Sequence, residues 1–166
     1  IPEGTPLDRD HRERSVSSLL RDQLPAPIVE VLKEAGRLGD ALHCSVYAVG
    51  GFVRDLIMKR ANLDIDLSVE GDGIAFAEAL AERLKGRVRT HKKFRTAIVF
   101  YTDSEGLPQH LDVATARLEY YEYPAALPTV ELSSIKMDLY RRDFTINALA
   151  IQLNASRFGT LIDPFG

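Results

Sequence analysis

The sequence predicts a mixed α/β fold of the α+β kind, with a mostly antiparallel sheet and helices packed on one face. Short runs with an apolar residue at every second position recur along the chain, which is typical of half-buried strands. Longer segments between them carry apolar residues three and four positions apart, which is typical of amphipathic helices. With 166 residues, 45% of them hydrophobic, the chain is long enough to bury a core.

The N-terminal part is predicted to differ from the rest. Residues 1–14 are polar, contain two prolines and lack periodicity, so we expect a linker or arm. Helical spacing then covers 15–44, in two helices at Ser15–Leu24 and Pro27–His43. We therefore expect three parts: an arm, an N-terminal helical segment, and a main domain over 45–166.

The main domain alternates between the two patterns. Strands are predicted at 46–49, 63–69, 87–91, 96–101, 110–114, 150–153 and 160–162. Helices are predicted at 52–59, 74–84, 134–140 and 144–149. The three strands between 87 and 114 follow one another through short turns, so we expect antiparallel pairs. Residues 117–132, rich in Tyr and Pro, are predicted to form an irregular loop.

Composition excludes several classes of protein. A net charge of −3 argues against a general polyanion binder, although a local basic patch remains compatible with it. Cys44 is the only cysteine, so there is no disulfide framework and no cysteine-based zinc site. With neither a signal peptide nor a membrane-length apolar run, we expect a cytoplasmic protein with no membrane partner. Both ends of the chain look cut, so we expect a piece of a larger protein; its oligomeric state cannot be predicted.

Asp64 and Asp66 are the first candidate site residues. Apolar residues occupy every second position over Leu63–Val69, so this strand should turn one face to the core. Both aspartates then project from the other face. Neighbouring carboxylates repel each other unless a cation lies between them, and Mg²⁺ prefers such oxygen ligands together with phosphates. A solvent-exposed strand face is the alternative.

Asp112 adds a third carboxylate. In the strand 110–114 it should point away from the core, together with His110. If this strand lies beside the strand of Asp64 and Asp66, three acids converge. Three acids around two divalent ions are an arrangement that supports in-line transfer from a nucleoside triphosphate. Taken alone, Asp112 would be an exposed acid.

A glycine turn precedes these acids. Gly50 and Gly51 join a strand to a helix, where backbone N–H groups and the helix dipole can meet a phosphate chain. Arg54 lies one turn into that helix and could reach the same anion with its planar fork of donors. Alternatively, the glycines only make a tight turn and Arg54 pairs with a surface acid.

Other arginines are candidates for the same phosphates. Arg141 and Arg142 precede a predicted helix, and Arg117 follows the Asp112 strand. Each could hold phosphate or pair with a nearby acid.

The segment Arg87–Arg95 is locally basic. If it forms one strand, Arg89, Lys93 and Arg95 share a face that could contact an RNA backbone. An edge strand protected by charge is the alternative.

Three motifs in this order resemble a known family. Gly50–Asp55, Asp64–Asp66 and Arg141–Ala148 look like the head domain of bacterial-type (class II) tRNA nucleotidyltransferases and poly(A) polymerases, nearest the CCA-adding and A-adding enzymes. The resemblance implies the nucleotidyltransferase fold. It implies that Asp64 and Asp66 bind Mg²⁺, with two ions in the active complex, and that Gly51 and Arg54 contact the triphosphate. Asp112 falls where the family has a further active-site acid, and Arg117 matches a nucleotide-contacting arginine.

The resemblance also implies a function. The expected reaction is template-independent, Mg²⁺-dependent addition of AMP, or of CMP and AMP, from ATP or CTP to a tRNA 3′ end with release of pyrophosphate. The family selects the base with a Glu-Asp-x-x-Arg motif in the neck domain that follows, and these 166 residues lack that motif. Poly(A) synthesis on other RNA 3′ ends, transfer to another acceptor, and an inactive nucleotide- or RNA-binding module are the alternatives.

Overall fold

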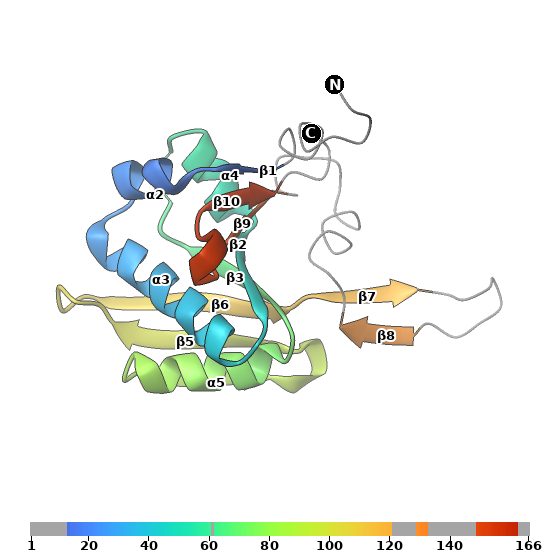
Figure 1. Cartoon of the computed structure of the whole chain (residues 1–166). Coiled ribbons are helices and arrows are strands. Elements are labelled where there is room, and N and C mark those ends of the chain that lie inside the picture. The colour runs from blue at the N-terminus through green and yellow to red at the C-terminus, as the bar shows by residue number, and fades with distance from the viewer. Residues whose placement is uncertain (1–12, 61, 121–128, 133–148, 163–166) are drawn as a thin grey trace, which may run out of the picture.

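The computed structural model describes residues 13–60, 62–120, 129–132 and 149–162 (Figure 1). Its strands are β1 (Glu13–Ser15), β2 (Ser45–Val49), β3 (Ile65–Glu70), β4 (Arg87–His91), β5 (Thr96–Thr102), β6 (Pro108–Thr115), β7 (Arg117–Tyr120), β8 (Thr129–Leu132), β9 (Ala150–Gln152) and β10 (Thr160–Ile162). Its α-helices are α2 (Ser17–Gln23), α3 (Ala26–Ala41), α4 (Gly51–Ile57) and α5 (Gly73–Arg83), with short 3₁₀ turns η1 (Lys92–Phe94) and η3 (Ala155–Arg157).

Within the described residues, eight strands form one mixed sheet in the order β1-β10-β9-β2-β3-β6-β5-β4. All neighbouring strands run antiparallel except β3 and β6, which are parallel. The predicted hairpins of β4, β5 and β6 are confirmed, as is the mostly antiparallel sheet. The helices lie on one side of it, as Figure 1 shows for α3 and α5.

The helices cover one face because the strands place alternate apolar residues there. Ile65, Leu67 and Val69 of β3, with Leu111 and Val113 of β6, are at most 1% exposed. They share one core cluster with residues of α3 and α5, which pack on β2 and on β5, respectively. Burying each such side chain contributes about 1.5–3 kcal/mol, so this face fixes the register of the strands.

The N-terminal segment belongs to the same core. The predicted helices appear as α2 and α3, and Leu20 and Leu32 from them are fully buried against the sheet. The predicted arm is wrong at its end, because Glu13 and Arg14 pair with β10 as part of β1. Three residues are too few to show periodicity, and pairing with a sheet edge overrides local composition. Residues 1–12 lie outside the described residues.

The Asp64–Asp66 strand starts later than predicted. The ladder with β6 begins at Ile65, opposite Leu111. Leu63 is 44% exposed, so its predicted place in the core is wrong. The alternating pattern placed the start of the strand two residues too early, because no partner strand pairs with the chain before Ile65.

The predicted loop 117–132 is partly wrong. β7 and β8 pair antiparallel, with Arg117 opposite Leu132, as a two-stranded ribbon beside the sheet (Figure 1). Of the Tyr and Pro residues that suggested a loop, Tyr120 ends β7 and the others lie at 121–128, outside the described residues. The predicted helices at 134–140 and 144–149 also fall outside them, except for Leu149.

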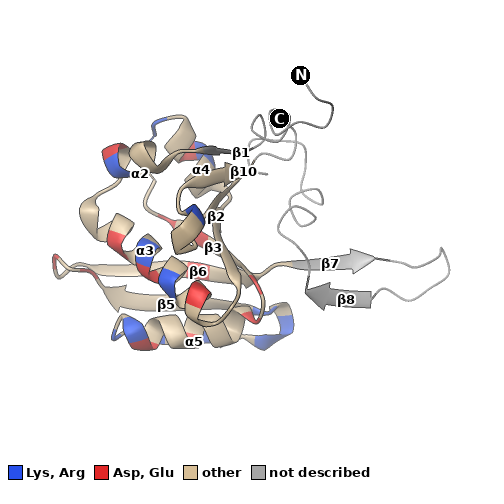
Figure 2. Ribbon diagram, in the orientation of Figure 1, with Lys and Arg blue, Asp and Glu red and all other residues tan. Residues whose placement is uncertain are grey.

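Charged residues of both signs are interspersed on the helices and turns (Figure 2). Within the part of the chain that the structure describes, no helix combines the length and apolar character needed to cross a membrane.

Candidate active site

The turn between β2 and α4 brings the chain close to an acidic side chain. Gly50 adopts φ 75° and ψ −150°, a conformation that is essentially restricted to glycine. Its carbonyl accepts hydrogen bonds from the N–H groups of Val53 and Arg54, both at 3.1 Å, which starts the helix. A Cβ added at Gly50 would lie 3.3 Å from Oδ2 of Asp66. The predicted strand–glycine–helix element is confirmed, and its backbone lies against a candidate metal ligand.

Asp66 and Asp112 lie side by side on the face of the sheet opposite the helices. They are register partners in the parallel pair of β3 and β6, which confirms that these strands are adjacent. Adjacent strands are about 4.8 Å apart, so both carboxylates reach the same space. Carboxylate oxygens at this separation fit the donor set that Mg²⁺ prefers.

Asp64 is exposed and precedes the first residue of β3. Among the described residues, no three His, Cys, Asp or Glu side chains gather closely enough to hold a metal ion. Of the three carboxylates predicted to converge, the structure therefore brings Asp66 and Asp112 together. The ladder does not fix the direction of Asp64, because that residue lies before the first paired position.

A cavity of about 390 Å³ links these parts. Its lining residues are Val49, Gly50, Asp66, Leu67, Thr96, Ala97, Ile98, Asp112, Val113 and Ala114. The cavity extends from the glycine turn across β3 and β6 to β5. The sequence did not indicate Thr96 and Ile98, because their place depends on register: Ile98 lies opposite Asp112 in the β5–β6 hairpin.

Arg54 turns back over the glycine turn. One terminal nitrogen of its guanidinium lies 3.3 Å from the position that a Cβ on Gly51 would take. Its Nε donates to Oδ1 of Asp55 at 3.1 Å. Arg54 therefore does pair with an acid, as the alternative interpretation predicted. That acid is not on the surface, because Asp55 is only 9% exposed, and it belongs to the same Gly50–Asp55 motif. The pairing fixes the guanidinium beside the start of α4.

Asp55 connects Arg54 to the segment that carries Asp64. Nδ2 of Asn62 donates to Oδ2 of Asp55 at 2.7 Å, and Oδ1 of Asn62 accepts the N–H of Asp64 at 2.8 Å. The hydrogen bonds from Arg54 and Asn62 lower the pKa of Asp55 below its ordinary value of 3.8. Sequence analysis assigned no role to Asp55 or Asn62, and the adjacency of Asp55 to Arg54 was the only signal for either residue.

The basic segment differs from its prediction. Arg87, Arg89 and His91 are exposed at alternate positions of β4, but the strand ends there. Lys93 lies in η1, and Arg95 has φ 53°, in the left-handed region. The prediction that Arg89, Lys93 and Arg95 share one face is therefore wrong. The chain must reverse within four residues after β4 to enter β5, so Lys93 and Arg95 do not continue the face of Arg89.

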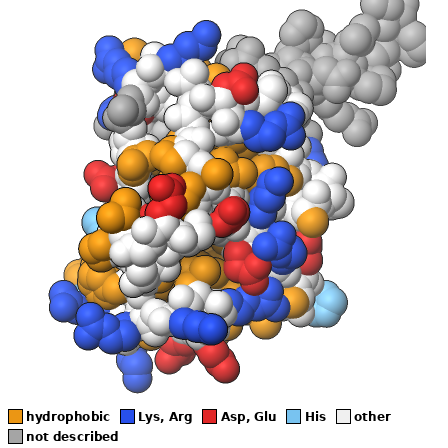
Figure 3. Space-filling view, turned by 90° about the vertical axis from the view of Figure 1, so that its left-hand side faces the viewer, with side chains coloured by type: hydrophobic (Ala, Val, Ile, Leu, Met, Phe, Trp, Pro, Cys, Tyr) orange, Lys and Arg blue, Asp and Glu red, His pale blue; other side chains and the backbone are white. Residues whose placement is uncertain are grey.

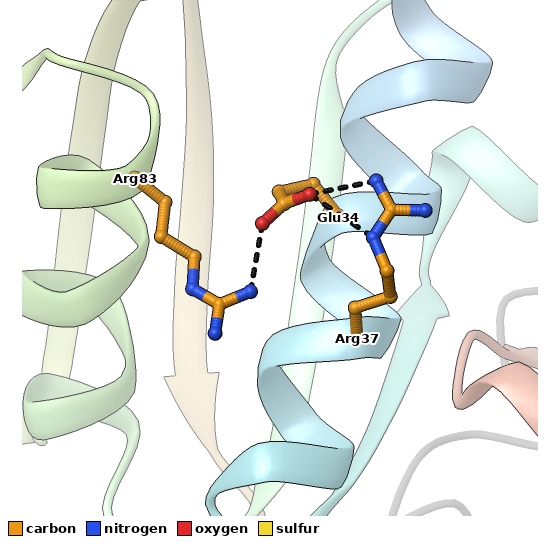
Figure 4. A network of polar contacts seen from close by, with 3 residues as sticks. All are labelled: Glu34, Arg37 and Arg83. Carbon is orange, nitrogen blue, oxygen red and sulfur yellow. Dashed lines mark hydrogen bonds and ion pairs between the residues drawn. The ribbon is translucent and has the colours of Figure 1, made fainter.

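A second polar cluster lies on the helix side. Glu34 of α3 accepts hydrogen bonds from Arg37 at 2.7 Å and from Arg83 of α5 at 2.8 Å (Figure 4). Both partners lower the pKa of Glu34. They border a cavity of about 360 Å³ between α3, α5 and the end of β5. Figure 3, which views the molecule from the left of Figure 1, shows acidic and basic side chains side by side on that face of the molecule.

Comparison with known proteins identifies the family to which the chain is similar. Residues 46–166 match the family described as "Poly A polymerase head domain". The chain belongs to this family. The matched range contains the glycine turn, Asp66 and Asp112 together.

Curated relatives of this head domain add detail. An A-adding tRNA nucleotidyltransferase of Geobacter sulfurreducens is 60% identical over 155 residues, which is 93% of this chain and 17% of the relative. An A-adding tRNA nucleotidyltransferase of Halalkalibacterium halodurans is 38% identical over 163 residues, covering 96% of this chain and 37% of the relative. The chain thus spans well under half the length of these curated relatives.

Solved structures resemble this head domain as well. A Thermotoga maritima CCA-adding enzyme complexed with tRNA has a TM-score of 0.74 and 44% identity, covering 92% of this chain and 32% of that one. A CCA-adding enzyme complexed with ATP has a TM-score of 0.78 and 46% identity, covering 93% and 33%.

Three predicted residues of the head domain stay predictions. Arg117 begins β7, where only the backbone is described, and Arg141 and Arg142 lie outside the described residues.

Proposed function

We propose that this chain is the catalytic head of a tRNA nucleotidyltransferase that transfers AMP from ATP to a tRNA 3′-hydroxyl and releases pyrophosphate. The observation that carries the proposal is the cavity in which the Gly50 turn, Asp66 and Asp112 meet. The two A-adding relatives favour AMP over CMP as the added nucleotide. The CCA-adding structures with tRNA and with ATP support both substrates.

The triphosphate lies at the start of α4. The first turn of a helix leaves backbone N–H groups without partners inside the helix, and its dipole favours an anion there. Arg54, fixed by Asp55 beside Gly51, adds a planar fork of donors to the same oxygens. Gly50 lets the phosphate chain approach the backbone and Asp66 at once.

Asp66 and Asp112 would hold Mg²⁺ in this cavity, and the family resemblance implies Asp64 as a further ligand and two ions in the active complex. When bound, the metal would supply charge neutralisation at the α-phosphate and lower the pKa of the attacking hydroxyl. The carboxylates fix where that charge lies, and Asp112, on the side away from Gly50, faces the attacking hydroxyl. These residues contact phosphate and metal alone, so the choice of base depends on other residues. We also propose that this tRNA-processing role is carried out in the cytoplasm.

The test is single-nucleotide addition by the full-length protein. Purified tRNA transcripts ending in -C-C, or lacking all of C-C-A, are incubated with Mg²⁺ and labelled ATP or CTP. We expect one AMP on the -C-C transcript and no CMP on either. Addition of C-C-A to the shortened transcript would show that the protein is a CCA-adding and not an A-adding enzyme. Long A tracts on unrelated RNA would favour poly(A) synthesis. No incorporation on any RNA would contradict the proposed function.

A further inference from the structure

We infer that the 3′ end of the acceptor RNA crosses the face of the sheet opposite the helices, from Asp112 over Ile98 to Arg89, where Phe100 holds the Arg89 guanidinium for an RNA phosphate. The inference rests on the proposed nucleotidyl transfer. It adds a direction for the RNA and names a positioning residue outside the metal and triphosphate site.

The register of four strands defines this path. Asp66 is paired with Asp112, Asp112 with Ile98, and Ile98 with Arg89, from β3 through β6 and β5 to β4. Paired residues share a face of a sheet, and strands are about 4.8 Å apart. Arg89 therefore stands about 10 Å from Asp112, on the side away from Gly50. The cavity that contains both aspartates already reaches Ile98.

The geometry of phosphoryl transfer sets the side from which the RNA 3′-hydroxyl approaches. In an in-line displacement, the attacking oxygen approaches the α-phosphate opposite the leaving pyrophosphate. The pyrophosphate side is the start of α4, where a Cβ on Gly50 would lie 3.3 Å from Oδ2 of Asp66 and one on Gly51 would lie 3.3 Å from the Arg54 guanidinium. The 3′-hydroxyl must then arrive from the Asp112 side. The nucleotides behind it have β5 and β4 beneath them.

The end of this path at β4 has basic and aromatic side chains, the residue types that bind single-stranded RNA. Cζ of Arg89 lies 5.6 Å from the centroid of the Phe100 ring, a cation–π contact that restrains the guanidinium. The His110 ring lies 6.4 Å from Phe100 on the same face. Arg87 is the next exposed arginine on β4, opposite Phe100. Basic groups beside aromatic rings can bind phosphates while a base stacks.

Arg87 and Arg89 are not neutralised by an acidic partner among the described residues. Within the described residues, neither Arg87 nor Arg89 forms an ion pair, whereas Arg37, Arg54 and Arg83 each do. The donors of Arg89 are thus available to a phosphate. Lys93 and Arg95 are on the turn after β4 and do not continue this face, so the inference excludes them from the path.

The test compares Arg89→Ala with Arg37→Ala in the full-length protein, using A addition to a tRNA transcript ending in -C-C. Arg37 is an exposed arginine on the helix side, so the control removes the same charge elsewhere. For Arg89→Ala we expect the KM for tRNA to rise about tenfold, with the KM for ATP unchanged. The slope of log affinity against log salt should fall by about 0.7, the value for one phosphate contact with a single strand.

Two further variants sharpen the result. Arg89→Lys should restore the salt slope but only part of the tRNA KM, because lysine keeps the charge and loses the planar stacking. Phe100→Leu should raise the tRNA KM and leave the salt slope unchanged. An active wild-type enzyme whose tRNA KM and salt slope are unaltered by Arg89→Ala would overturn this inference and leave the proposed function intact. An inactive wild-type enzyme would instead count against the proposed function.

Discussion

The two faces of the sheet use the same strands for different purposes. Toward the helices, Ile65 and Leu111 are at most 1% exposed and belong to the core. Toward the opposite side, their chain neighbours Asp66 and Asp112 line a cavity. A slip of one residue would exchange the two faces, so the apolar packing on one side sets the position of the carboxylates on the other.

The two polar networks differ in the same way. Glu34 joins α3 to α5 through Arg83, which is 38% exposed, and also pairs with Arg37 of its own helix, which is 57% exposed. Asp55 is 9% exposed and joins Arg54 to the segment before β3. Exposed ion pairs contribute little to stability, whereas a buried carboxylate with several donors holds its partners in place. The first network should therefore matter to the fold only slightly, and the second to the site.

The largest predicted effect is at the carboxylates. Asp66→Asn should reduce nucleotide addition at least a thousandfold, about 4 kcal/mol of transition-state stabilisation. Asn keeps the size but loses the charge that holds the cation. Single-turnover rates measure the loss, and the exposed helix residue variant Asp22→Asn is the control. A rate for Asp66→Asn within tenfold of wild type would remove Asp66 from the metal site.

The glycine turn offers a matched pair of variants. Gly50 and Gly106 both have positive φ, 75° and 82°, so Ala should cost each about 1–3 kcal/mol of stability. Only Gly50→Ala places a Cβ 3.3 Å from Asp66, since Gly106 has open space around it. We expect at least tenfold lower activity for Gly50→Ala alone, compared at a temperature where both variants are folded. Equal activities would separate the turn from the site.

Asp55→Asn should weaken the site without touching the metal. Loss of the charge releases Arg54 and Asn62, so we expect about a 10–100-fold decrease in kcat/KM, with a higher KM for ATP. Asp103→Asn is the control, because Asp103 caps the distant β5–β6 turn through the N–H groups of Glu105 and Leu107. An unchanged KM for ATP would show that Asp55 does not position Arg54.

The pH dependence of the Asp55 variant has a defined sign. The folded-state pKa of Asp55 lies below its ordinary value of 3.8, because Arg54 and Asn62 donate to the ionised form. Its contribution to stability is thus present above pH 3.8 and is lost as the pH falls through the lowered pKa. The difference in unfolding free energy between wild type and Asp55→Asn should be constant near neutral pH and shrink below pH 3.8. A difference that already shrinks between pH 7 and 5 would contradict this.

The smallest effect is expected on the helix side. Glu34→Gln should cost less than about 1 kcal/mol, because its partners are exposed and screened by solvent. Denaturant unfolding measures this, and nucleotide addition should be unchanged. A large loss of activity would mean that the helix face contributes to the site.

Much of this could be predicted from the sequence, for local reasons. Alternation identified β3 and β6, and Gly50-Gly51 marked the turn, because period and turn chemistry are written in neighbouring residues. The contributions of Ile98 and Asn62 could not be predicted, since they depend on strand register and on a hydrogen bond across a loop. The end of β4 at His91 agrees with the strand predicted at 87–91. The shared face of Arg89, Lys93 and Arg95 did not follow, because the basic alternation continues through the reversal after that strand.

Calorimetric titration with ATP, in Mg²⁺ and then in EDTA, tests the central claim most directly. If Asp66 acts through a bound cation, Asp66→Asn should weaken Mg-ATP binding at least tenfold, about 1.4 kcal/mol. Without the metal, the same change removes a negative charge close to the triphosphate, so ATP should bind the variant as well as, or better than, the wild type. An equal loss of affinity with and without Mg²⁺ would contradict a metal site on the face of the sheet opposite the helices.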